Sequence, residues 1–359
     1  MNIKALSLFS GMGGDTLGMT RAGVDVVSYS ELKVYIQNTH EANFPNSTLL
    51  GGDIAKVTDD SLRELESQDI GMVFAGFPCQ GFSNAGKKLP DDPRNTLFRE
   101  FVRCTGILKP NVIIGENVKG LLSRKTAEGR SYIDVIVESF ENMGYSVIFK
   151  VCKAHLYGVP QKRERLIIVG VKRTKLEDFN LSFPPEDAVE LAPNLKNIVS
   201  FGMTGTIAVP MEWFEGIPEE CVLTDMENEE GAYGAHPYLL SKVAAAGDQL
   251  SYAGKTYTML FSFGKRISPI HCEIVDIRLP AKTIICTFEH QPRLFLPIRN
   301  KNGYYLRCMS PDELKQIQGF PADYQVSGSV KEQIIQIGNA VPPPLIEKIV
   351  RHVCNVAKV

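Results

Sequence analysis

The sequence lacks the cysteine pairs and the long apolar runs that mark several classes of protein. Its eight cysteines include no CxxC pair, and the two closest lie 14 residues apart, so neither a structural zinc site nor a disulfide framework is expected. No apolar run approaches the roughly 18 residues of a membrane span, and no charged leader precedes the first apolar segment. We therefore expect an intracellular protein that is not secreted, does not enter a membrane and holds no metal.

An excess of charge of one sign is also missing. The chain has 39 basic and 41 acidic residues, with a net charge of -2. This balance argues against a histone-like or strongly basic nucleic-acid coat protein, but it allows a local basic groove. Eight of the acidic residues lie in the segment of residues 212–230, which has no basic residue. With 359 residues, a prior of about 150 residues per domain indicates two domains.

Short continuous apolar runs alternate with helical patterns over the first 175 residues. Strands are expected at residues 3–9, 24–30, 72–76, 112–115 and 166–171, and helices at residues 15–22 and 34–43. Continuous apolar strands separated by helices are typical of a parallel sheet that helices cover on both faces. The predicted fold class is α/β, with a doubly wound, mostly parallel sheet of the Rossmann type that binds ligands at the carboxyl ends of its strands.

The alternation stops between about residues 178 and 300, where proline, glycine and irregular polar segments replace it. Helical patterns return at residues 310–319, where Ser310 and Glu313 match a capping box, and at residues 345–353, after three prolines. We predict one domain formed by residues 1–177 and 322–359. A smaller, irregular, β-rich domain is inserted at residues 178–321.

A glycine-rich turn follows the first predicted strand and precedes a helix in which Asp15 is the expected N-cap. Gly11, Gly13 and Gly14 stand where such a sheet binds nucleotide-like ligands, although a tight turn without a ligand also uses glycine. Thr16 breaks the GxGxxG fingerprint. The turn therefore argues against a nicotinamide or flavin dinucleotide.

Acidic residues follow the next two apolar segments. Glu31 ends the second predicted strand, 20 residues after Gly11, where a carboxylate can accept both ribose hydroxyls. Asp53 follows the third segment, where it can accept from an exocyclic amine. A solvated loop carboxylate is the alternative for each residue. Ribose and adenine without a pyrophosphate indicate S-adenosylmethionine.

Cys79 follows another hydrophobic strand, in a loop that contains proline and glycine. Such a loop can expose and activate the sulfur, as a nucleophile requires; a small buried apolar residue is the alternative. Glu116 ends a further strand and points at the same edge. Arg163 and Arg165 stand just before a strand, where an ordinary charged strand entrance is the alternative.

Taken in order, these segments resemble the DNA (cytosine-5) methyltransferase family over nearly the whole chain. The matching blocks are FSGMGG at residues 9–14, Glu31, Asp53 with Ile54, GFPCQGFS at residues 76–83, ENV at residues 116–118, QKRER at residues 161–165, QGFP at residues 318–321 and GNAVP at residues 338–342. The resemblance implies a Rossmann-like methyltransferase fold. It also implies an enzyme that flips a cytosine out of duplex DNA and methylates its carbon 5.

The resemblance assigns roles to the catalytic residues. The Cys79 thiolate adds to carbon 6 of cytosine, which makes carbon 5 nucleophilic. Glu116 hydrogen-bonds ring nitrogen 3 and the exocyclic amino group, Arg165 faces the carbonyl oxygen, and Arg163 supports the pocket. After methyl transfer, a base derived from water removes the carbon 5 proton and Cys79 leaves.

The resemblance also implies S-adenosylmethionine as cofactor, S-adenosylhomocysteine as its product, and no metal. The implied cofactor contacts are Phe9, Gly11, Met12, Gly13, Glu31, Leu32, Asp53, Ile54, Pro78, Leu97, Asn339 and Val341. The implied DNA contacts are Gln80, Ser83 and Arg94, in a mobile lid of residues 80–94, and Thr283, in an AKTI landmark at residues 281–284. Further candidates for phosphate contacts, with a solvated face as the alternative for each, are Arg266, Lys282, Arg293, Arg299, Lys301 and Arg307.

Double-stranded DNA is the implied partner, a cognate restriction endonuclease is a candidate partner, and a monomer is the expected state. Two residues depart from the family: Lys33 stands where an acidic residue is frequent, and Ala340 where a serine is frequent. The acidic segment of residues 212–230 is expected to be a surface insertion that faces away from DNA.

Two other functions remain open. The tRNA-modifying branch shares the catalytic set but typically has Cys-Phe-Thr in its recognition region. This chain has CTF at residues 286–288 and FPCQ at residues 77–80, which favours DNA. A catalytically silent DNA-binding regulatory homologue is disfavoured because Cys79, Gln80, Glu116, Arg163 and Arg165 are all present. A dehydrogenase is disfavoured by the missing pyrophosphate fingerprint.

Overall fold

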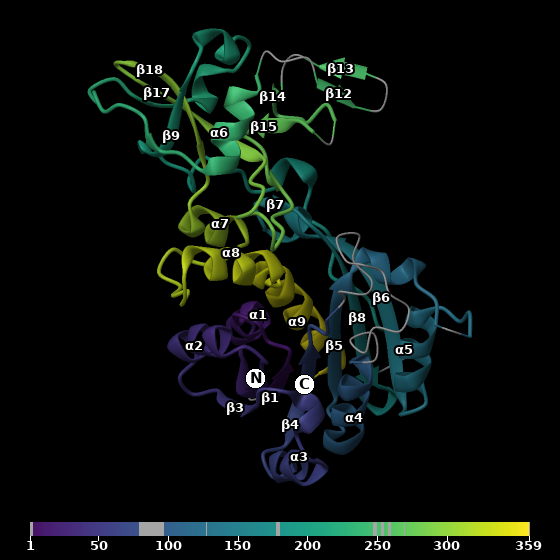
Figure 1. Cartoon of the computed structure of the whole chain (residues 1–359). Coiled ribbons are helices and arrows are strands. Elements are labelled where there is room, and N and C mark those ends of the chain that lie inside the picture. The colour runs from purple at the N-terminus through teal and green to yellow at the C-terminus, as the bar shows by residue number, and fades with distance from the viewer. Residues whose placement is uncertain are drawn as a thin grey trace.

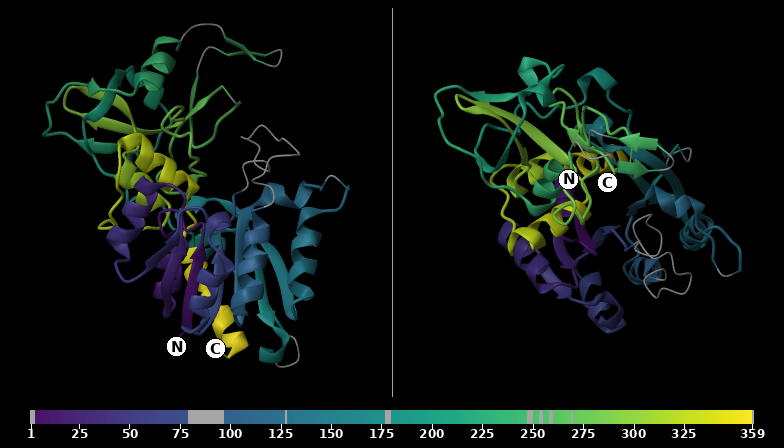
Figure 2. Two further views of the ribbon diagram at one scale, coloured as in Figure 1. Left: turned by 60° about the horizontal axis from the view of Figure 1, so that its bottom comes forward. Right: turned by 45° about the horizontal axis from the view of Figure 1, so that its top comes forward.

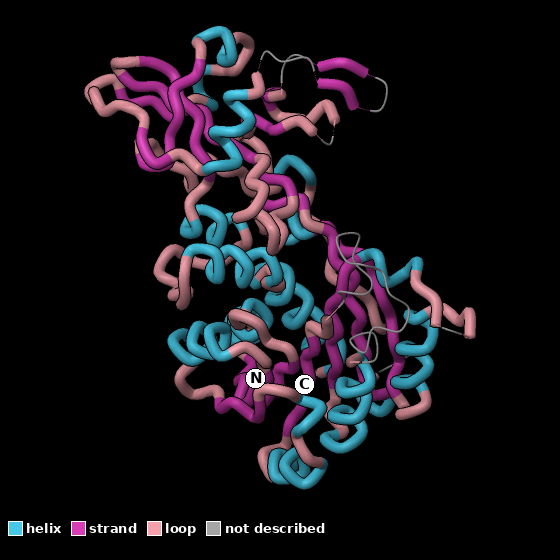
Figure 3. The backbone as a smooth tube through the Cα atoms, viewed as in Figure 1, coloured by secondary structure: helices cyan, strands magenta, loops and turns pink. Residues whose placement is uncertain are grey.

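The structure is a computed structural model that describes residues 3–78, 97–126, 128–176, 180–246, 250–252, 255–257, 260–268 and 270–358. It consists of two lobes (Figure 1). The first lobe is a sheet covered by helices, and both ends of the chain lie in it. The second lobe consists mainly of strands and long loops with a few short helices, as the colours of Figure 3 show.

Within the described residues, the first lobe contains a seven-stranded sheet in the order β3-β2-β1-β4-β5-β8-β6. Its strands are β1 (Ile3–Leu8), β2 (Val24–Ser30), β3 (Thr48–Gly51), β4 (Ile70–Ala75), β5 (Val112–Val118), β6 (Tyr145–Lys153) and β8 (Glu164–Lys172). All neighbouring pairs are parallel except those that β8 makes with β5 and β6. The mostly parallel sheet is thus confirmed, with β8, expected at residues 166–171, running in the opposite direction.

Helices cover both faces of this sheet. On one face, α1 (Gly14–Arg21) and α9 (Pro343–Ala357) share a core with Met72 and Phe74 of β4. On the other face, a second core holds Val73 and Ala75 of the same strand, together with residues of α3 (Asp59–Glu66), α4 (Phe98–Leu108) and α5 (Tyr132–Glu141). Successive side chains of a strand point to opposite faces, so a strand buried on both faces is apolar throughout.

The second lobe contains a sheet of mixed direction. Its order is β11-β9-β18-β17-β15-β14, and β10 pairs with β17. The strands are β9 (Thr204–Val209), β10 (Leu223–Asp225), β11 (Tyr233–Gly234), β14 (Phe261–Phe263), β15 (Cys272–Ile274), β17 (Leu294–Asn300) and β18 (Gly303–Cys308). The short pair β12 (Leu250–Tyr252) and β13 (Lys255–Tyr257) and helix α6 (Pro237–Ala244) lie beside it. The lobe is irregular and β-rich, and the limits of the inserted domain at residues 178 and 321 stay a prediction.

Two helices and a small pair of strands join the lobes (Figure 2). Helices α7 (Pro311–Ile317) and α8 (Val330–Asn339) lie between the two sheets. Strand β7 (Gln161–Lys162) of the first lobe pairs with β16 (Ala281–Lys282) of the second. A core cluster also connects Met12 and Ile36, from the first lobe, with Ile284 and Leu314. This junction lies at the edge of the first sheet where its parallel strands end.

Several local predictions can be compared with the structure directly. The bounds of β2 and of α2 (Val34–Asn43) agree with the predicted ranges, and Ser310 caps α7 in a capping box with Glu313. The prediction that Asp15 caps the first helix is wrong. Gly13 is the N-cap of α1, and Asp15 lies buried in its first turn.

Candidate active site

Gly76 brings three of the predicted site segments together at the edge of the first sheet. A Cβ atom placed on Gly76 would lie 3.6 Å from the carbonyl oxygen of Phe9, 3.8 Å from Val341 Cγ2 and 3.9 Å from Glu116 Oε2. Three residues further along, Cys79 lies outside the described residues, as do Gln80, Ser83 and Arg94. The described backbone therefore approaches Cys79 between the glycine-rich turn, the C-terminal segment and Glu116.

Asn117 holds the last residues before Cys79 against the end of β5. Its Nδ2 donates to the carbonyl oxygen of Phe77 at 3.1 Å, and its Oδ1 accepts from the Val118 amide at 2.9 Å. Asn117 is 1% exposed, so water does not compete with these bonds, and the amide replaces the hydrogen bonds that a strand neighbour would supply. This residue was not predicted individually, although it stands inside the ENV block.

Glu116 and Arg165 form a buried ion pair at this edge. β5 and β8 are antiparallel neighbours, and their register pairs Val118 with Arg165, so the start of β8 meets the end of β5. Arg165 Nε lies 2.8 Å from Glu116 Oε1, and the side chains are 13% and 11% exposed. Burial raises the pKa of Glu116 above its ordinary value, against the opposing effects of Arg165 and Arg163. A carboxyl group in this state holds a proton more readily than an exposed one.

Arg163 faces the junction between the lobes. Its side chain is 1% exposed and donates to three carbonyl oxygens, those of Ile284 at 2.9 Å, Gly338 at 3.0 Å and Ala340 at 3.2 Å. It therefore fastens the end of α8 and the second lobe to the start of β8. Its role in supporting the catalytic pocket stays a prediction; its neighbour Arg165 is the arginine that meets Glu116.

Two glutamines complete the junction, and neither was predicted as a site residue. Gln161 Nε2 donates to Gln318 Oε1 at 2.5 Å, and Gln318 Nε2 donates to the carbonyl oxygen of Ala340 at 2.6 Å. Gln161 Oε1 accepts from the Ile284 amide at 3.0 Å, and both glutamines are 0% exposed. Their occurrence in the QKRER and QGFP blocks was the available signal.

The glycine-rich turn adopts a strained backbone between β1 and α1. Phe9 has a φ of 57° and Gly11 a φ of 56°, and the left-handed region is costly for a phenylalanine and free for a glycine. A Cβ on Gly14 would lie 2.0 Å from the carbonyl oxygen of Val341. The turn is therefore packed directly on the segment that follows α8. Two segments that are far apart in the sequence, the glycine-rich turn and the C-terminal segment, thus lie against each other.

Glu31 accepts hydrogen bonds from that turn. Its Oε2 accepts from the Gly11 amide at 3.1 Å and its Oε1 from the Lys33 amide at 2.9 Å, and burial raises its pKa. The Gly13 amide donates to the carbonyl oxygen of Ser10 at 3.0 Å. The amides of Gly11 and Gly13 therefore already have acceptors within the protein. The turn does not offer them to a pyrophosphate, in agreement with the missing fingerprint.

The segment of residues 52–54 lies beside Glu31 and Leu32. A Cβ on Gly52 would lie 3.8 Å from the carbonyl oxygens of both residues. Asp53 is the N-cap of the short helix η1 (Ile54–Lys56), and its Oδ1 accepts from the Ala55 amide at 3.2 Å. Leu32 is 66% exposed. Two carboxylates next to an exposed apolar side chain suit a nucleoside with ribose hydroxyls and an amino group.

The remaining predicted cofactor residues differ in exposure. Pro78 and Leu97 are half-buried, Leu97 is the N-cap of α4, and Asn339 is exposed at the end of α8. Val341 is buried beside Gly76 and Gly14. The side chain of Met12 is 1% exposed and packs in the core that joins the lobes, where the Tyr324 hydroxyl donates to its carbonyl oxygen.

A buried polar network beneath the turn was missed from the sequence. Asp15 accepts hydrogen bonds from the hydroxyls of Ser7 and Ser10. Ser10 also meets Thr16 at 3.1 Å, and Thr16 Oγ1 lies 3.1 Å from His40 Nε2. Burial raises the pKa of Asp15 to about 6 and lowers that of His40 to about 3. The signal was the cluster of short polar residues around the glycines.

In the second lobe, several of the basic residues that were predicted to contact phosphates are paired with acidic residues. Arg307 and Glu313 form two hydrogen bonds, of 2.7 and 2.8 Å, and each side chain is 7% exposed. Arg307 is therefore a core residue, and its prediction as a phosphate contact is wrong. Lys282 pairs with Glu273. Thr283 donates to the carbonyl oxygen of Lys162 at 3.0 Å, next to the junction, and its DNA contact stays a prediction.

The acidic segment of residues 212–230 is built into the second sheet rather than attached as a loose insertion. It contains β10, which pairs with β17, and its Trp213 ring lies 4.9 Å from that of Phe261. Its acidic side chains form pairs with basic residues of this lobe: Glu220 with Arg278 at 3.1 Å, Glu219 with Arg299 at 3.9 Å, and Glu229 with Lys301. The prediction that the segment faces away from DNA remains open.

The described residues contain neither a candidate membrane span nor a candidate metal site. Among the helices of the described ranges, none combines the length and the apolar character of a membrane span. In the same residues, no group of three or more histidine, cysteine, aspartate or glutamate side chains is placed to hold a metal ion.

Comparisons with known proteins cover nearly the whole chain. The family model of C-5 cytosine-specific DNA methylases matches residues 3–355. The type II methyltransferase M1.HphI of Haemophilus parahaemolyticus is 30% identical over 361 residues, covering 98% of this chain and 87% of that one. The type II methyltransferase M.PspPI of Psychrobacter sp. is 33% identical over 341 residues, covering 94% and 75%.

A solved structure agrees in fold. It is described as a DNA modification methyltransferase encoded within a prophage of E. coli, and it covers 100% of both chains with a TM-score of 0.70 and 22% identity. The α/β fold with a Rossmann-like methyltransferase sheet is therefore confirmed.

Proposed function

This chain belongs to the C-5 cytosine-specific DNA methylase family, and we propose that it methylates a cytosine flipped out of double-stranded DNA. Family membership makes it a cytosine-5 DNA methyltransferase. The observation that carries the residue-level proposal is the buried pair of Glu116 and Arg165. This pair lies beside Gly76, on the backbone that runs into Cys79.

Glu116 and Cys79 work together in the proposed reaction. The Cys79 thiolate forms a bond to carbon 6 of the flipped cytosine, and the electron pair of the ring double bond moves to carbon 5. The raised pKa of Glu116 favours a proton shared with ring nitrogen 3, which offsets the negative charge that the thiolate brings. Arg165 donates to the carbonyl oxygen, and Arg163 holds the start of β8 in place.

S-adenosylmethionine supplies the methyl group, as an electrophile on a sulfonium, when it is bound. Carbon 5 then carries both the methyl group and a proton. A base derived from water removes that proton, and the bond from Cys79 to carbon 6 breaks to restore the aromatic ring. The carbon 5 proton is lost to solvent and S-adenosylhomocysteine would leave as the second product, whereas the Cys79 thiolate and the proton shared by Glu116 return to their starting states for another turnover.

The proposed cofactor pocket is lined by the glycine-rich turn, Glu31 and the C-terminal segment. Glu31 would hold the ribose hydroxyls and Asp53 the adenine amino group, with apolar contacts from Leu32 and Ile54. The engaged amides of the turn support a ligand without pyrophosphate. The full proposed set is Phe9, Gly11, Met12, Gly13, Glu31, Leu32, Asp53, Ile54, Pro78, Leu97, Asn339 and Val341.

DNA is proposed to bind at the edge of the first sheet, between a catalytic domain of residues 1–177 and 322–359 and a small domain of residues 178–321. Gln80, Ser83, Arg94 and Thr283 are the proposed contacts. Because its relatives are type II methyltransferases, a cognate restriction endonuclease is its proposed partner. We further propose that the protein acts inside the cell as a monomer.

Trapping of the covalent intermediate tests this proposal. The protein is incubated with a sequence-diverse duplex library that carries 5-fluorocytosine, with and without S-adenosylmethionine, and adducts are resolved under denaturing conditions. Fluorine cannot leave as a proton does, so a stable adduct is expected only with the cofactor. Sequencing of unmodified DNA after methylation then identifies the target sequence.

The controls separate the site from the rest of the chain. Cys79→Ser is expected to form no adduct, whereas Cys286→Ser, which changes a half-buried cysteine in the second lobe, is expected to form it. A tRNA arm tests the related RNA reaction. Absence of an adduct with DNA for the wild type and both variants would overturn the proposal, and an adduct with tRNA alone would reassign the substrate.

A further inference from the structure

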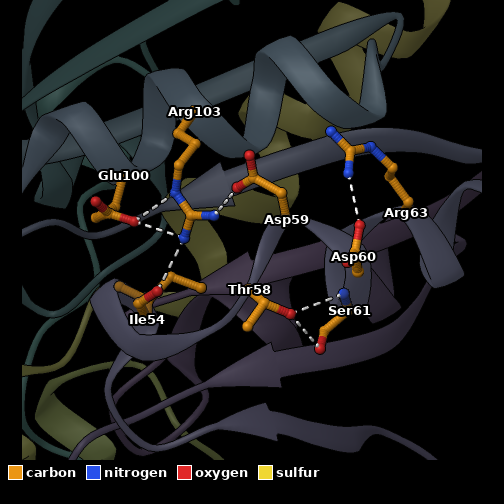
Figure 4. Close-up of polar contacts among 8 residues, drawn as sticks. All are labelled: Ile54, Thr58, Asp59, Asp60, Ser61, Arg63, Glu100 and Arg103. Atoms are coloured by element: carbon orange, nitrogen blue, oxygen red, sulfur yellow. Dashed lines mark hydrogen bonds and ion pairs between the residues drawn. The ribbon is translucent and has the colours of Figure 1, made fainter.

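Arg103 connects three elements of the first lobe through one guanidinium group (Figure 4). It lies on α4, where its Nε donates to Glu100 Oε2 at 2.8 Å, one turn away on the same helix. Its Nη1 donates to Asp59 Oδ1 at 2.6 Å, in the first turn of α3. Its Nη2 donates to the carbonyl oxygen of Ile54 at 3.0 Å, in η1.

The bond to Ile54 acts on the proposed cofactor pocket. Ile54 begins η1, which Asp53 caps, and these two residues are the proposed contacts on the adenine side. The Ile54 carbonyl also accepts from the Val57 amide at 3.2 Å. The Ile54 carbonyl is thus held both from inside its own turn and from a neighbouring helix, and the preceding residue, Asp53, caps the same turn.

The helix that carries Arg103 begins at the same pocket. Leu97, another proposed cofactor contact, is the N-cap of α4. The opposite side of α4 buries Phe98 and Phe101 in the core that also holds Ile54. Apolar packing fixes how deeply α4 sits, but it leaves rotation and sliding less restricted than directed hydrogen bonds do. Arg103 supplies those directed bonds between the two sides of the pocket.

A pair on the neighbouring helix α3 serves as an ordinary ion pair for comparison. Arg63 and Asp60 lie 2.7 Å apart within α3, and their side chains are 56% and 89% exposed (Figure 4). Exposed pairs of this kind contribute little. Arg103 is 26% exposed and uses the planar fork of arginine, which a lysine does not reproduce.

We propose that Arg103 is a positioning residue for the cofactor. It holds η1, with Asp53 and Ile54, at a set distance from Leu97 at the start of α4, and it touches neither the cofactor nor DNA. This inference rests on the proposed function, because it assumes that these residues line the adenine side of an S-adenosylmethionine pocket.

The test measures cofactor binding and catalysis separately in the full-length protein. Arg103→Met and Arg103→Lys are compared with Arg63→Met as the matched control. The Kd of S-adenosylhomocysteine and the KM of S-adenosylmethionine are expected to rise about 10-fold in both Arg103 variants, equivalent to about 1.4 kcal/mol. At saturating cofactor, kcat is expected to stay within about twofold of the wild type. Arg63→Met is expected to change neither quantity.

Calorimetric stoichiometry distinguishes weak binding from loss of folded protein, because a partly unfolded sample binds less ligand with unchanged affinity. The inference is overturned if Arg103→Lys binds like the wild type, if the Arg103 variants lose kcat with unchanged KM, or if only their stoichiometry falls. If the wild type itself neither binds S-adenosylhomocysteine nor methylates DNA, the proposed function fails and takes this inference with it.

Discussion

Three buried carboxyl groups at the edge of the first sheet contrast with Asp276 of the second lobe. At the edge of the first sheet, burial raises the pKa of Glu116 and Glu31, and that of Asp15 to about 6. In the second lobe, hydrogen bonds from Arg278 lower the pKa of Asp276 to about 2. Carboxyl groups whose pKa is raised by burial are concentrated at functional sites, whereas carboxylates paired with arginine are common structural devices. The proposed proton transfer uses one of the raised groups, Glu116.

The acidic partners of the basic residues can also be compared between the lobes. Arg165, at the first sheet, is paired with Glu116 beside the segment that leads to Cys79. In the second lobe, Arg278, Arg299 and Lys301 are paired with the acidic segment of residues 212–230. Three basic residues of the second lobe are thus paired with acidic side chains of the same lobe.

Replacement of Glu116 by glutamine is the change with the largest expected effect. The variant keeps the size of the side chain but cannot exchange a proton with the base, so the rate of methyl transfer is expected to fall by about 10²–10⁴-fold. Single-turnover methyl transfer measures this rate, with Glu212→Gln, an exposed acidic residue of the second lobe, as control. Wild-type activity in Glu116→Gln would remove the functional contrast between the lobes.

The pH dependence of the methyl-transfer rate, measured for the wild type and for Glu116→Gln, gives a second prediction. The protonated form of Glu116 persists to higher pH than that of an exposed glutamate, because burial raises its pKa. The wild-type rate is expected to decline as pH rises through that raised pKa, and the decline is expected to be absent in Glu116→Gln.

Arg307→Met tests whether the buried ion pair between Arg307 and Glu313 stabilises the fold of the second lobe. It leaves Glu313 buried without its cation, so the free energy of unfolding is expected to fall by about 3–5 kcal/mol. Lys301→Met breaks a pair whose side chains are 59% and 64% exposed, and its loss is expected to stay below about 1 kcal/mol. Urea denaturation measures both. Equal losses would show that burial does not set the value of these pairs.

Asp15→Asn tests, through the pH dependence of stability, whether folding raises the pKa of this buried carboxyl group. Folding raises the pKa of Asp15 from 3.8 to about 6, so the folded protein binds the proton more tightly than the unfolded chain. The free energy of unfolding of the wild type therefore falls as pH rises from about 4 to about 6, by an amount approaching about 3 kcal/mol. The asparagine variant is expected to lack this contribution in urea denaturation at a series of pH values.

Asp276→Asn provides the opposite case. The pKa of Asp276 is lowered from 3.8 to about 2, so its contribution is present above its ordinary pKa and is lost as pH falls towards about 2. If the two variants change the pH dependence in the same direction, the contrast between the lobes is wrong.

Neutralisation of the acidic segment carries the smallest expected effect. In Glu219→Gln combined with Glu229→Gln, the pairs with Arg299 and Lys301 are weakened, and the free energy of unfolding is expected to change by less than about 1 kcal/mol. Because the segment is predicted to face away from DNA, the salt dependence of DNA binding is expected to stay the same. A logarithmic salt slope steeper by about 1 per released cation would place the segment at the DNA instead.

Much of the first lobe was predictable because its signals are local in the chain. Strand β2 and helix α2 were predicted with their observed bounds, and the capping box of Ser310 and Glu313 was found in the structure. The blocks that contain Glu116, Arg165 and the glycine-rich turn identified the family, since each joins a strand end to a chemically defined side chain. The direction of β8 was not predicted, because an apolar run reads the same for either direction.

The sequence by itself determined the order of elements, the family and the residue types at the strand ends, because periodicity, turn chemistry and motif blocks involve neighbours along the chain. Only the tertiary structure decided that Asp15 is buried under the turn, that Arg307 is a core residue, and that Arg103 holds η1. Whether a charged side chain is buried or exposed depends on segments that the fold brings to it from elsewhere in the chain, as Arg103 meets Asp59 and Ile54 and Arg307 meets the carbonyl oxygen of Ser200. Its burial, and with it its pKa and its function, is a property of the packed fold.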